Sequence, residues 1–183
     1  MTIRSFDPCS DMVRVLDLYQ ACFAEPPWHE RFDVCELQRE FEEIASWKET
    51  IFLVACEEGS SQEIVGGAIA FSLSRKSDVL ELAGVQETES LYMAELFVAL
   101  HKREHGIGRQ LTQARLNLGW SLGFRRAVVR TSLQQKIVQD LYRNIYGFQT
   151  VCVQQVTSLK WIDGIEQSVP DQRVILSGAI PTP

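Results

Sequence analysis

The segment from Arg103 to Arg109, Arg-Glu-His-Gly-Ile-Gly-Arg, has the residue types that bind a phosphate group. It lies between an apolar run at 91–100 and a segment at 107–122 whose pattern predicts a helix. The first amides of a helix have no partner within the helix, and the helix dipole adds partial positive charge there. Gly106 and Gly108 have no Cβ, so the backbone can approach a ligand closely. The segment therefore predicts a site for phosphate or pyrophosphate.

Two better-known phosphate motifs do not fit this segment. The dinucleotide fingerprint needs a third glycine where Leu111 stands, and the P-loop needs a Gly-Lys-Ser/Thr sequence that is absent. His101 and His105 have the His-x-x-Glu-His spacing of one zinc protease class, but the glycines that follow interrupt the helix that this motif requires. No metal site is expected. On the motif alone, a plain strand-to-helix turn is the alternative.

Glu95 is a carboxylate within an otherwise apolar strand. Ionised carboxylates are rarely buried without a partner, so this side chain needs a cationic partner, a cavity or water. Burial would raise its pKa towards the range that is useful to a general base. The alternative is a structural role for Glu95, paired with an arginine such as Arg130.

The run from Glu95 to Gly108 resembles the acetyl-CoA-binding segment of the GCN5-related N-acetyltransferases (GNAT). That family carries Arg/Gln-x-x-Gly-x-Gly/Ala after its central strand, and Arg103, Gly106 and Gly108 fill these positions. The resemblance implies that the backbone of the turn holds the pyrophosphate of acetyl-CoA. It also implies that strand backbone binds the pantetheine arm, and that a splay after the strand frees these groups. The cofactor-binding residues predicted in this way are Phe97, Val98, Arg103, Glu104, His105, Gly106, Ile107, Gly108, Arg109 and Gln135.

A second segment, from Gln135 to Phe148, resembles the family's Asn-x-x-Ala-x-x-x-Tyr-x-x-x-Gly-Phe sequence. Gln135 and Val138 replace the Asn and Ala of the family. One extra residue also lies between Tyr142 and Gly147. These departures put the placement of the tyrosine in question.

The resemblance implies that Tyr142 protonates the leaving thiolate and that Glu95 accepts the proton of the amine, directly or through water. The spacing from Gln135 favours Tyr142, counting back from Gly147 gives Arg143, and Tyr146 competes for the role. An amphipathic core tyrosine is the alternative for Tyr142.

The loop that contains Trp28 and His29 borders the acceptor pocket in the family, so these residues and Glu95 are the predicted acceptor contacts. A tryptophan that closes the edge of the core is the alternative for Trp28. The resemblance covers residues 91 to 148 most clearly.

The surrounding pattern predicts the elements that must position these residues. Helices are expected from a cap at Ser10 or Asp11 to about residue 23, from Asp33 to Trp47, at 107–122 and at 134–146. Strands are expected at 3–6, 51–57, 64–73, 91–99, 126–131, 148–157 and near 173–176, with Val79–Leu82 as an edge strand, a turn at 58–61 and another at 161–164. This order predicts a single α/β domain over 1–183, with a mixed, mostly antiparallel sheet flanked by helices in the GNAT-like, acyl-CoA N-acyltransferase fold.

Composition narrows the function classes further. The chain has 183 residues and a net charge of −6, which argues against nucleic acid as a partner. The longest apolar run and the polar N-terminus predict no membrane span and no signal peptide, so a cytoplasmic protein is expected. The five cysteines form no Cys-x-x-Cys pair, which favours free buried thiols over a disulfide or zinc site.

The sequence thus predicts an N-acetyltransferase that uses acetyl-CoA as co-substrate and a small amine as acceptor, by direct attack without a covalent enzyme intermediate. A protein N-terminus or lysine as acceptor, an inactive CoA-binding sensor, and an unrelated module for another phosphorylated ligand are the alternatives. The acyl group and the oligomeric state, a homodimer included, stay open.

Overall fold

A computed structural model describes residues 1–59, 63–85 and 89–183 of the chain. Its strands are β1 Thr2–Ser5, β2 Ile51–Cys56, β3 Ile64–Ser72, β4 Ser90–Val98, β5 Arg126–Ser132, β6 Gln149–Ile162 and β7 Ile165–Ala179. Its helices are α1 Pro8–Phe23, α2 Val34–Ser46, α3 Ser77–Ala83, α4 Ile107–Ser121 and α5 Lys136–Asp140. Short 3-10 turns lie at Leu73–Arg75 and Leu100–Lys102.

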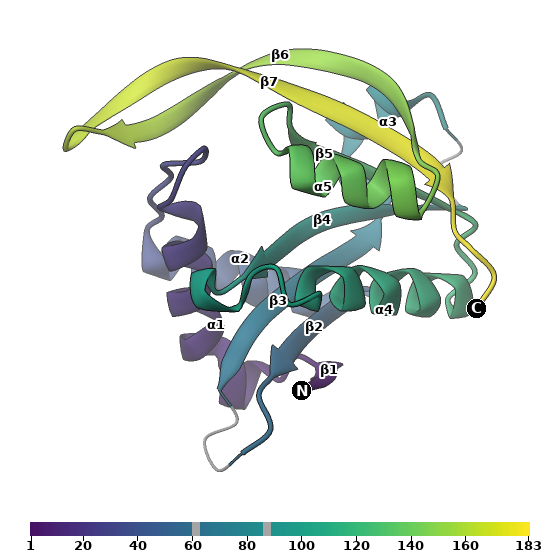
Figure 1. The fold of residues 1–183 in the computed structure, drawn as a ribbon, viewed down its shortest axis with the longest axis horizontal. Coiled ribbons are helices and arrows are strands. Elements are labelled where there is room, and N and C mark those ends of the chain that lie inside the picture. Colours follow the sequence, from purple (N-terminus) through teal and green to yellow (C-terminus); the bar gives the residue numbers. More distant parts are fainter. Residues whose placement is uncertain (60–62, 86–88) are drawn as a thin grey trace.

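In the described part of the chain the strands form one seven-stranded sheet in the order β1-β2-β3-β4-β5-β7-β6. Among the described strands only β4 and β5 pair in parallel, and α4 connects them. Helices α1, α2 and α3 cover one face through the core around Tyr19, Phe41 and Val79. Helices α4 and α5 lie on the other face, in front of the sheet in Figure 1. The predicted fold class is confirmed.

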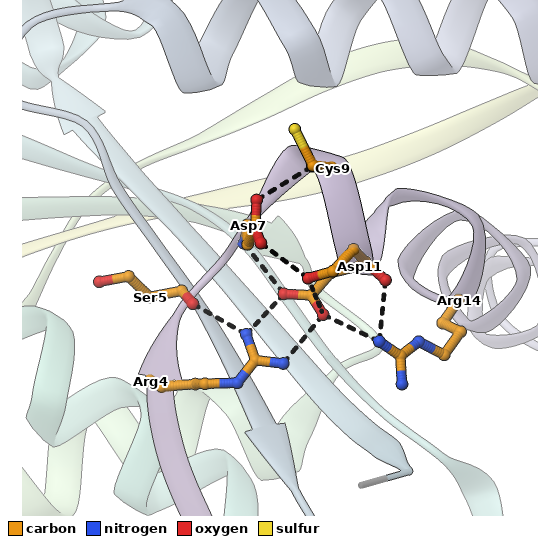
Figure 2. Close-up of polar contacts among 7 residues, drawn as sticks. Arg4, Ser5, Asp7, Cys9, Asp11 and Arg14 are labelled. Atoms are coloured by element: carbon orange, nitrogen blue, oxygen red, sulfur yellow. Dashed lines mark hydrogen bonds and ion pairs between the residues drawn. The ribbon is translucent and has the colours of Figure 1, made fainter. Parts of the chain in front are cut away.

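The first helix begins earlier than predicted. Asp7 is its N-cap and accepts from the amide of Cys9 at 3.0 Å, with Pro8 at the first helical position. Asp11, one of the two predicted caps, is fully buried and accepts from Arg4 at 2.5 and 2.9 Å (Figure 2). The Arg4 hydrogen bond lowers the pKa of Asp11. This pair joins β1 to α1. The predicted cap of α2 is confirmed, because Asp33 accepts from the amide of Glu36 at 3.0 Å.

One strand prediction was wrong, and two predicted strands were too short. Val79–Leu82 lies in the short helix α3, whose buried Val79 and Ala83 are four residues apart and so share a face. Gly84 ends that helix at φ 58°, a left-handed conformation that glycine adopts readily. The strands predicted at 148–157 and 173–176 are the inner parts of a much longer hairpin, β6–β7. Its turn at Asp163-Gly164, with φ 52° and 79°, confirms the turn predicted there. The turn predicted at 58–61 lies partly outside the described residues.

The helix predicted at 134–146 contains an irregularity that explains the extra residue of its motif. After α5 the chain continues as a π-helical turn at Leu141–Ile145. A π turn closes over five residues instead of four, so it absorbs one insertion without ending the helix. Tyr142 is the second residue of this wider turn, and its carbonyl accepts from the amide of Phe148 at 3.0 Å. The Gly147-Phe148 pair therefore keeps its place after the helix.

Candidate active site

The parallel strands β4 and β5 separate partway along their length. Their register runs only from Ser90 opposite Arg126 to Tyr92 opposite Val128. Beyond that point β5 continues to pair with β7, while β4 continues to pair with β3 up to Val98. The β5-facing edge of β4 therefore has no strand partner from Met93 to Val98 in the described structure. The predicted splay is present, and it opens toward the turn before α4.

The turn before α4 exposes backbone amides in the way an anion site requires. Glu104 and Gly106 adopt left-handed conformations, with φ 66° and 79°. The His105 ring nitrogen Nδ1 lies 2.7 Å from the carbonyl oxygen of Arg103, which braces the turn. Gly106 is the N-cap of α4 and supplies no side-chain cap, so the first amides of the helix are left for a ligand.

Gly108 differs from Gly106 in backbone conformation, so the reason for glycine at residue 108 is a different one. Its φ is not left-handed, and an added Cβ would meet the side chains of Leu96 and Val98 at 3.8 and 3.9 Å, which is ordinary contact. The protein itself therefore has room for a side chain at this position. Close approach of a ligand to the backbone is the remaining physical reason for glycine at residue 108.

The two arginines of the turn have different surroundings. Arg103 forms an ion pair with Glu25 at 2.9 Å and donates through Nε to the carbonyl of Val98 at 3.1 Å. The charge of Arg103 is therefore already compensated by Glu25. Arg109 is exposed and forms no ion pair in the described part of the chain. Arg109 is the side chain of this turn that is available to an anion.

Three other predicted cofactor contacts are Phe97, Val98 and Gln135. The ring of Phe97 is buried so closely against Gly67 that a Cβ there would lie 2.2 Å from it, which leaves the Phe97 backbone as the group for a ligand. The carbonyl of Val98 is engaged by Arg103 and by the thiol of Cys22, whose Sγ lies 3.3 Å away. Gln135 is half-buried at the N-cap of α5.

Glu95 lies on β4 within the splay, and Tyr19 of α1 lies near its carboxylate. Burial, followed by the charges of Glu30 and Glu40, raises the pKa of Glu95 to about 7, against the lowering effects of Tyr19 and Arg115. The alternative pairing with Arg130 does not occur, because Arg130 pairs with Asp78 at 2.7 Å. The Glu95 side chain is half-buried, so contact with solvent weakens the effect of burial on this pKa. A carboxylate with this pKa accepts protons near neutral pH.

The raised pKa of Glu95 predicts a stability difference with a defined sign. The folded state holds the proton of the Glu95 carboxyl more tightly than the unfolded chain does. The contribution of this proton to the free energy of unfolding is therefore present at acidic pH and is lost as pH rises through about 7. Replacement by glutamine removes the buried charge. At about 1.4 kcal/mol per pKa unit, discounted for partial exposure, we expect Glu95→Gln to be more stable than wild type by about 1–2 kcal/mol at alkaline pH.

Thermal unfolding at acidic and alkaline pH measures this difference. The melting temperature of Glu95→Gln should exceed that of wild type by about 3–6 °C at alkaline pH, and the difference should shrink on acidification. An equal difference at both pH values would contradict the assigned titration.

The two candidate tyrosines occupy distinct positions. Tyr142 is buried, with 1% of its surface exposed, and packs against Phe148 at 5.1 Å between ring centroids. Tyr146 is half-exposed, and its hydroxyl donates to the carbonyl of Arg109 at 3.3 Å. The Tyr146 hydroxyl therefore lies beside the anion-binding turn. Arg143, the third alternative, donates to Thr150 at 2.8 Å. Tyr142 alone of the three has a hydroxyl within the buried core of this face.

One side chain that the sequence prediction missed connects Glu95 with Tyr142. Arg115, on α4, donates through Nη1 to the backbone carbonyl of Glu95 at 2.8 Å. Through Nη2 it donates to the hydroxyl of Tyr142 at 3.2 Å. A single guanidinium therefore bridges the two predicted catalytic residues.

The loop after α1 is fastened to the β6–β7 hairpin, which arches over it in Figure 1. Lys160 donates to the carbonyl of Pro27 at 2.7 Å, and the amide of Trp161 donates to the carbonyl of His29 at 2.6 Å. Trp28 packs against Phe23, with the Arg173 guanidinium 4.6 Å from its ring centre. His29 thus fastens the loop to the hairpin, and Trp28 packs at the edge of the core, as the alternative considered for it predicted.

A cleft of about 410 Å³ lies beside this loop, between it and the hairpin. Its lining residues are Glu30, Arg31, Phe32, Thr157, Ser158, Leu159, Lys160, Trp161 and Glu166, so Trp28 and His29 are neighbours and not walls. Burial raises the pKa of Glu30, while the charges of Arg173 and Lys160 oppose that rise. The negative charge of Glu30 also contributes to the raised pKa of Glu95.

The described residues contain no cluster of three or more His, Cys, Asp or Glu placed to hold a metal ion. The cysteines are free thiols, but only Cys22 and Cys56 are buried, whereas Cys9 and Cys35 are exposed, contrary to the expectation of burial for all. No helix in the described ranges is both long and apolar enough to cross a membrane.

Comparison with known proteins agrees with this geometry. The sequence model of the acetyltransferase (GNAT) family matches residues 12–148. No curated protein sequence gives a significant match.

Solved structures similar to the chain share its fold over nearly the whole length. A ribosomal-protein-alanine N-acetyltransferase from Brucella melitensis is 15% identical, with 98% of this chain and 99% of that chain covered and a TM-score of 0.73. YncA, a putative acetyltransferase from Salmonella typhimurium with its cofactor acetyl-CoA, is 17% identical, with 100% and 95% covered and a TM-score of 0.71. A phosphinothricin acetyltransferase from Sinorhizobium meliloti in complex with acetyl-CoA is 16% identical, with 98% and 88% covered and a TM-score of 0.73.

Proposed function

Because the chain belongs to the acetyltransferase (GNAT) family, we propose that it transfers an acetyl group from acetyl-CoA to a small primary amine in a ternary complex. The observation that supports this proposal is the splay between β4 and β5, which carries Glu95 on β4, precedes the amide-rich turn, and is linked through Arg115 from the Glu95 backbone carbonyl to the Tyr142 hydroxyl. The exposed amides before α4 and the charge of Arg109 would hold the pyrophosphate. The edge of β4 that β5 no longer pairs with would hold the pantetheine arm, through hydrogen bonds to its backbone of the kind a neighbouring strand would make.

The proposed reaction is direct aminolysis of the thioester. The amine nitrogen attacks the acetyl carbon, the C–N bond forms, and the C–S bond breaks with its electron pair passing to sulfur. Glu95 accepts the proton lost by nitrogen, and the Tyr142 hydroxyl gives its proton to sulfur. Exchange with solvent then restores both groups. The products are the acetylated amine and CoA with a free thiol. Alignment of the reactants in one site supplies much of the acceleration.

A small amine is the acceptor best supported by the cleft. Its volume of about 410 Å³ lies within the range of small-molecule sites. Lys160 and Trp161, which line the cleft, donate to the carbonyls of Pro27 and His29 and so hold the hairpin against the loop, which favours a site of fixed size for a small acceptor. Glu30 would attract the ammonium form of the acceptor, and Glu95 would then receive its proton.

Two glutamates provide a matched test of the acceptor site. Glu30 lines the cleft and Glu40, on the exposed side of α2, does not, although both raise the pKa of Glu95 by their charge. We expect Glu30→Gln to raise the KM for an amine acceptor about 5- to 20-fold, through loss of about 1–2 kcal/mol of charge attraction. The KM for acetyl-CoA should stay unchanged, and Glu40→Gln should leave both constants near wild type.

Steady-state thiol release with a panel of small amines, peptides and proteins measures these constants. Equal changes of the KM for the amine in Glu30→Gln and Glu40→Gln would show that Glu30 is not part of the acceptor site. Efficient acetylation of peptide N-termini or lysines, with every small amine inactive, would replace the small acceptor by a protein.

A further inference from the structure

Arg115 carries a positive charge in the protein interior, where burial of a charge is energetically unfavourable. None of its surface is exposed, and it forms no ion pair with a carboxylate in the described part of the chain. Its Nε has no hydrogen-bond partner among the described residues. A buried charge without a counterion destabilises the fold, and an apolar side chain of similar volume would often serve stability better. Its burial therefore needs a reason beyond packing.

The contacts of Arg115 divide between the sheet and the tyrosine. Nη1 donates to the carbonyls of Ile69 and Glu95, at 2.9 and 2.8 Å, which face each other across β3 and β4. The register of these strands shifts directly after this pair, between Ile69 and Phe71. Nη2 donates to the hydroxyls of Tyr142, at 3.2 Å, and of Thr112, at 3.4 Å. The sheet contacts fix the guanidinium in place, and the guanidinium in turn fixes the hydroxyl of Tyr142.

We propose that Arg115 is a positioning residue for acetyl transfer. It orients the Tyr142 hydroxyl toward the thioester sulfur and stabilises the phenolate that Tyr142 becomes. This inference rests on the proposed function, in which Tyr142 is the proton donor. A guanidinium only donates hydrogen bonds, so the Tyr142 oxygen must be the acceptor in this contact. The proton of the hydroxyl is thereby left free for another acceptor.

The charge of Arg115 favours the same step. When the C–S bond breaks, the electron pair goes to sulfur and the tyrosine proton follows it, which leaves a phenolate on Tyr142. The positive guanidinium beside that oxygen stabilises the negative charge as it develops. Solvent later returns the proton. Charge near the oxygen is already in place before the reaction, so no reorganisation is needed when the proton moves.

A purely structural role for Arg115 gives a different kinetic result, which a double-mutant cycle separates. The cycle uses Arg115→Met, Tyr142→Phe and the double variant, with thiol release as the readout. If Arg115 acts through Tyr142, we expect Arg115→Met to lower kcat about 10- to 100-fold with the KM for acetyl-CoA within about twofold of wild type. The double variant should then be no slower than Tyr142→Phe by more than about twofold.

Two further variants keep the test decisive. Arg115→Lys keeps a charge near the phenol and should recover most of the kcat lost in Arg115→Met. If the methionine variant does not fold, the same cycle is run with Arg115→Gln. Thr112→Val removes the other Nη2 partner and leaves the Tyr142 contact in place, so its kcat should be near that of wild type.

Losses that multiply in the double variant, or a lysine variant no faster than the methionine variant, would overturn the role of Arg115. A Tyr142→Phe variant as fast as wild type would also overturn it, while acetyl transfer itself would stand. Failure of the proposed function looks different, since wild type would then release no thiol with any amine.

Discussion

Gly106→Asp should weaken acetyl-CoA binding by about 100-fold or more, equivalent to about 2.7 kcal/mol. Gly106 adopts φ 79° at the N-cap of α4, where the proposed pyrophosphate meets the first helix amides. A carboxylate there would face the phosphates with like charge and would itself occupy the amides that bind them. An added Cβ would meet only the end of Gln110, at 3.9 Å, so the protein has space for the side chain.

Gly106→Asn is the matched control for this substitution. Asparagine has the same shape as aspartate, and both tolerate the left-handed conformation better than other side chains do. We therefore expect the asparagine variant to fold equally well. Its Kd for acetyl-CoA should rise by no more than about one tenth of the factor found for the aspartate variant.

Acetyl-CoA at 100 times its Kd should stabilise wild type by about 2.7 kcal/mol, which corresponds to a rise of about 5–10 °C in the melting temperature. Under the same conditions Gly106→Asp should show almost no rise. Normal binding by a folded Gly106→Asp variant would place the pyrophosphate elsewhere.

Tyr142→Phe should lower kcat about 100-fold, in the range that one proton-transfer group supplies. The substitution removes the hydroxyl that accepts from Arg115 and keeps the ring that packs against Phe148. The KM for acetyl-CoA should change little, because the proposed pyrophosphate and pantetheine contacts are made by the turn and by β4.

Tyr146→Phe separates the two tyrosines. This change removes a hydroxyl that donates to the carbonyl of Arg109, beside the turn, so its expected effect is a modest rise in the KM for acetyl-CoA. A large loss of kcat in Tyr146→Phe, with Tyr142→Phe near wild type, would transfer the proton-donor role to Tyr146.

The parts of this site that the sequence predicts depend on short-range patterns. The turn before α4 follows from two glycines at the start of a helical pattern, because helix N-termini and left-handed glycines are local features. The extra residue after Tyr142 also has a local consequence, the π turn at Leu141–Ile145. The fold class follows from the order of strand and helix patterns.

The parts that the sequence does not predict depend on contacts between distant segments. Arg115 stands in a helical pattern where a charged side chain is expected to face water, and only the packing of α4 on β3 and β4 shows that it is buried. The ion pair of Arg103 with Glu25 likewise joins residues far apart in the sequence, so no local pattern predicts it. The hairpin β6–β7 was underestimated because its strands are mostly polar and half-exposed, with little apolar alternation to mark their length.

Amine-dependent release of the CoA thiol is the most direct measurement of the central claim, that this splay catalyses acetyl transfer from acetyl-CoA to an amine. Wild type, Tyr142→Phe and Gly106→Asp would be mixed with acetyl-CoA and a panel of amines, with the acetylated product followed by mass spectrometry. The account predicts thiol release by wild type in step with one acetylated amine product, slower turnover by Tyr142→Phe at saturating acetyl-CoA, and loss of activity in Gly106→Asp. Binding of acetyl-CoA by wild type without amine-dependent thiol release, for small amines and peptides alike, would contradict the account and indicate a CoA-binding sensor.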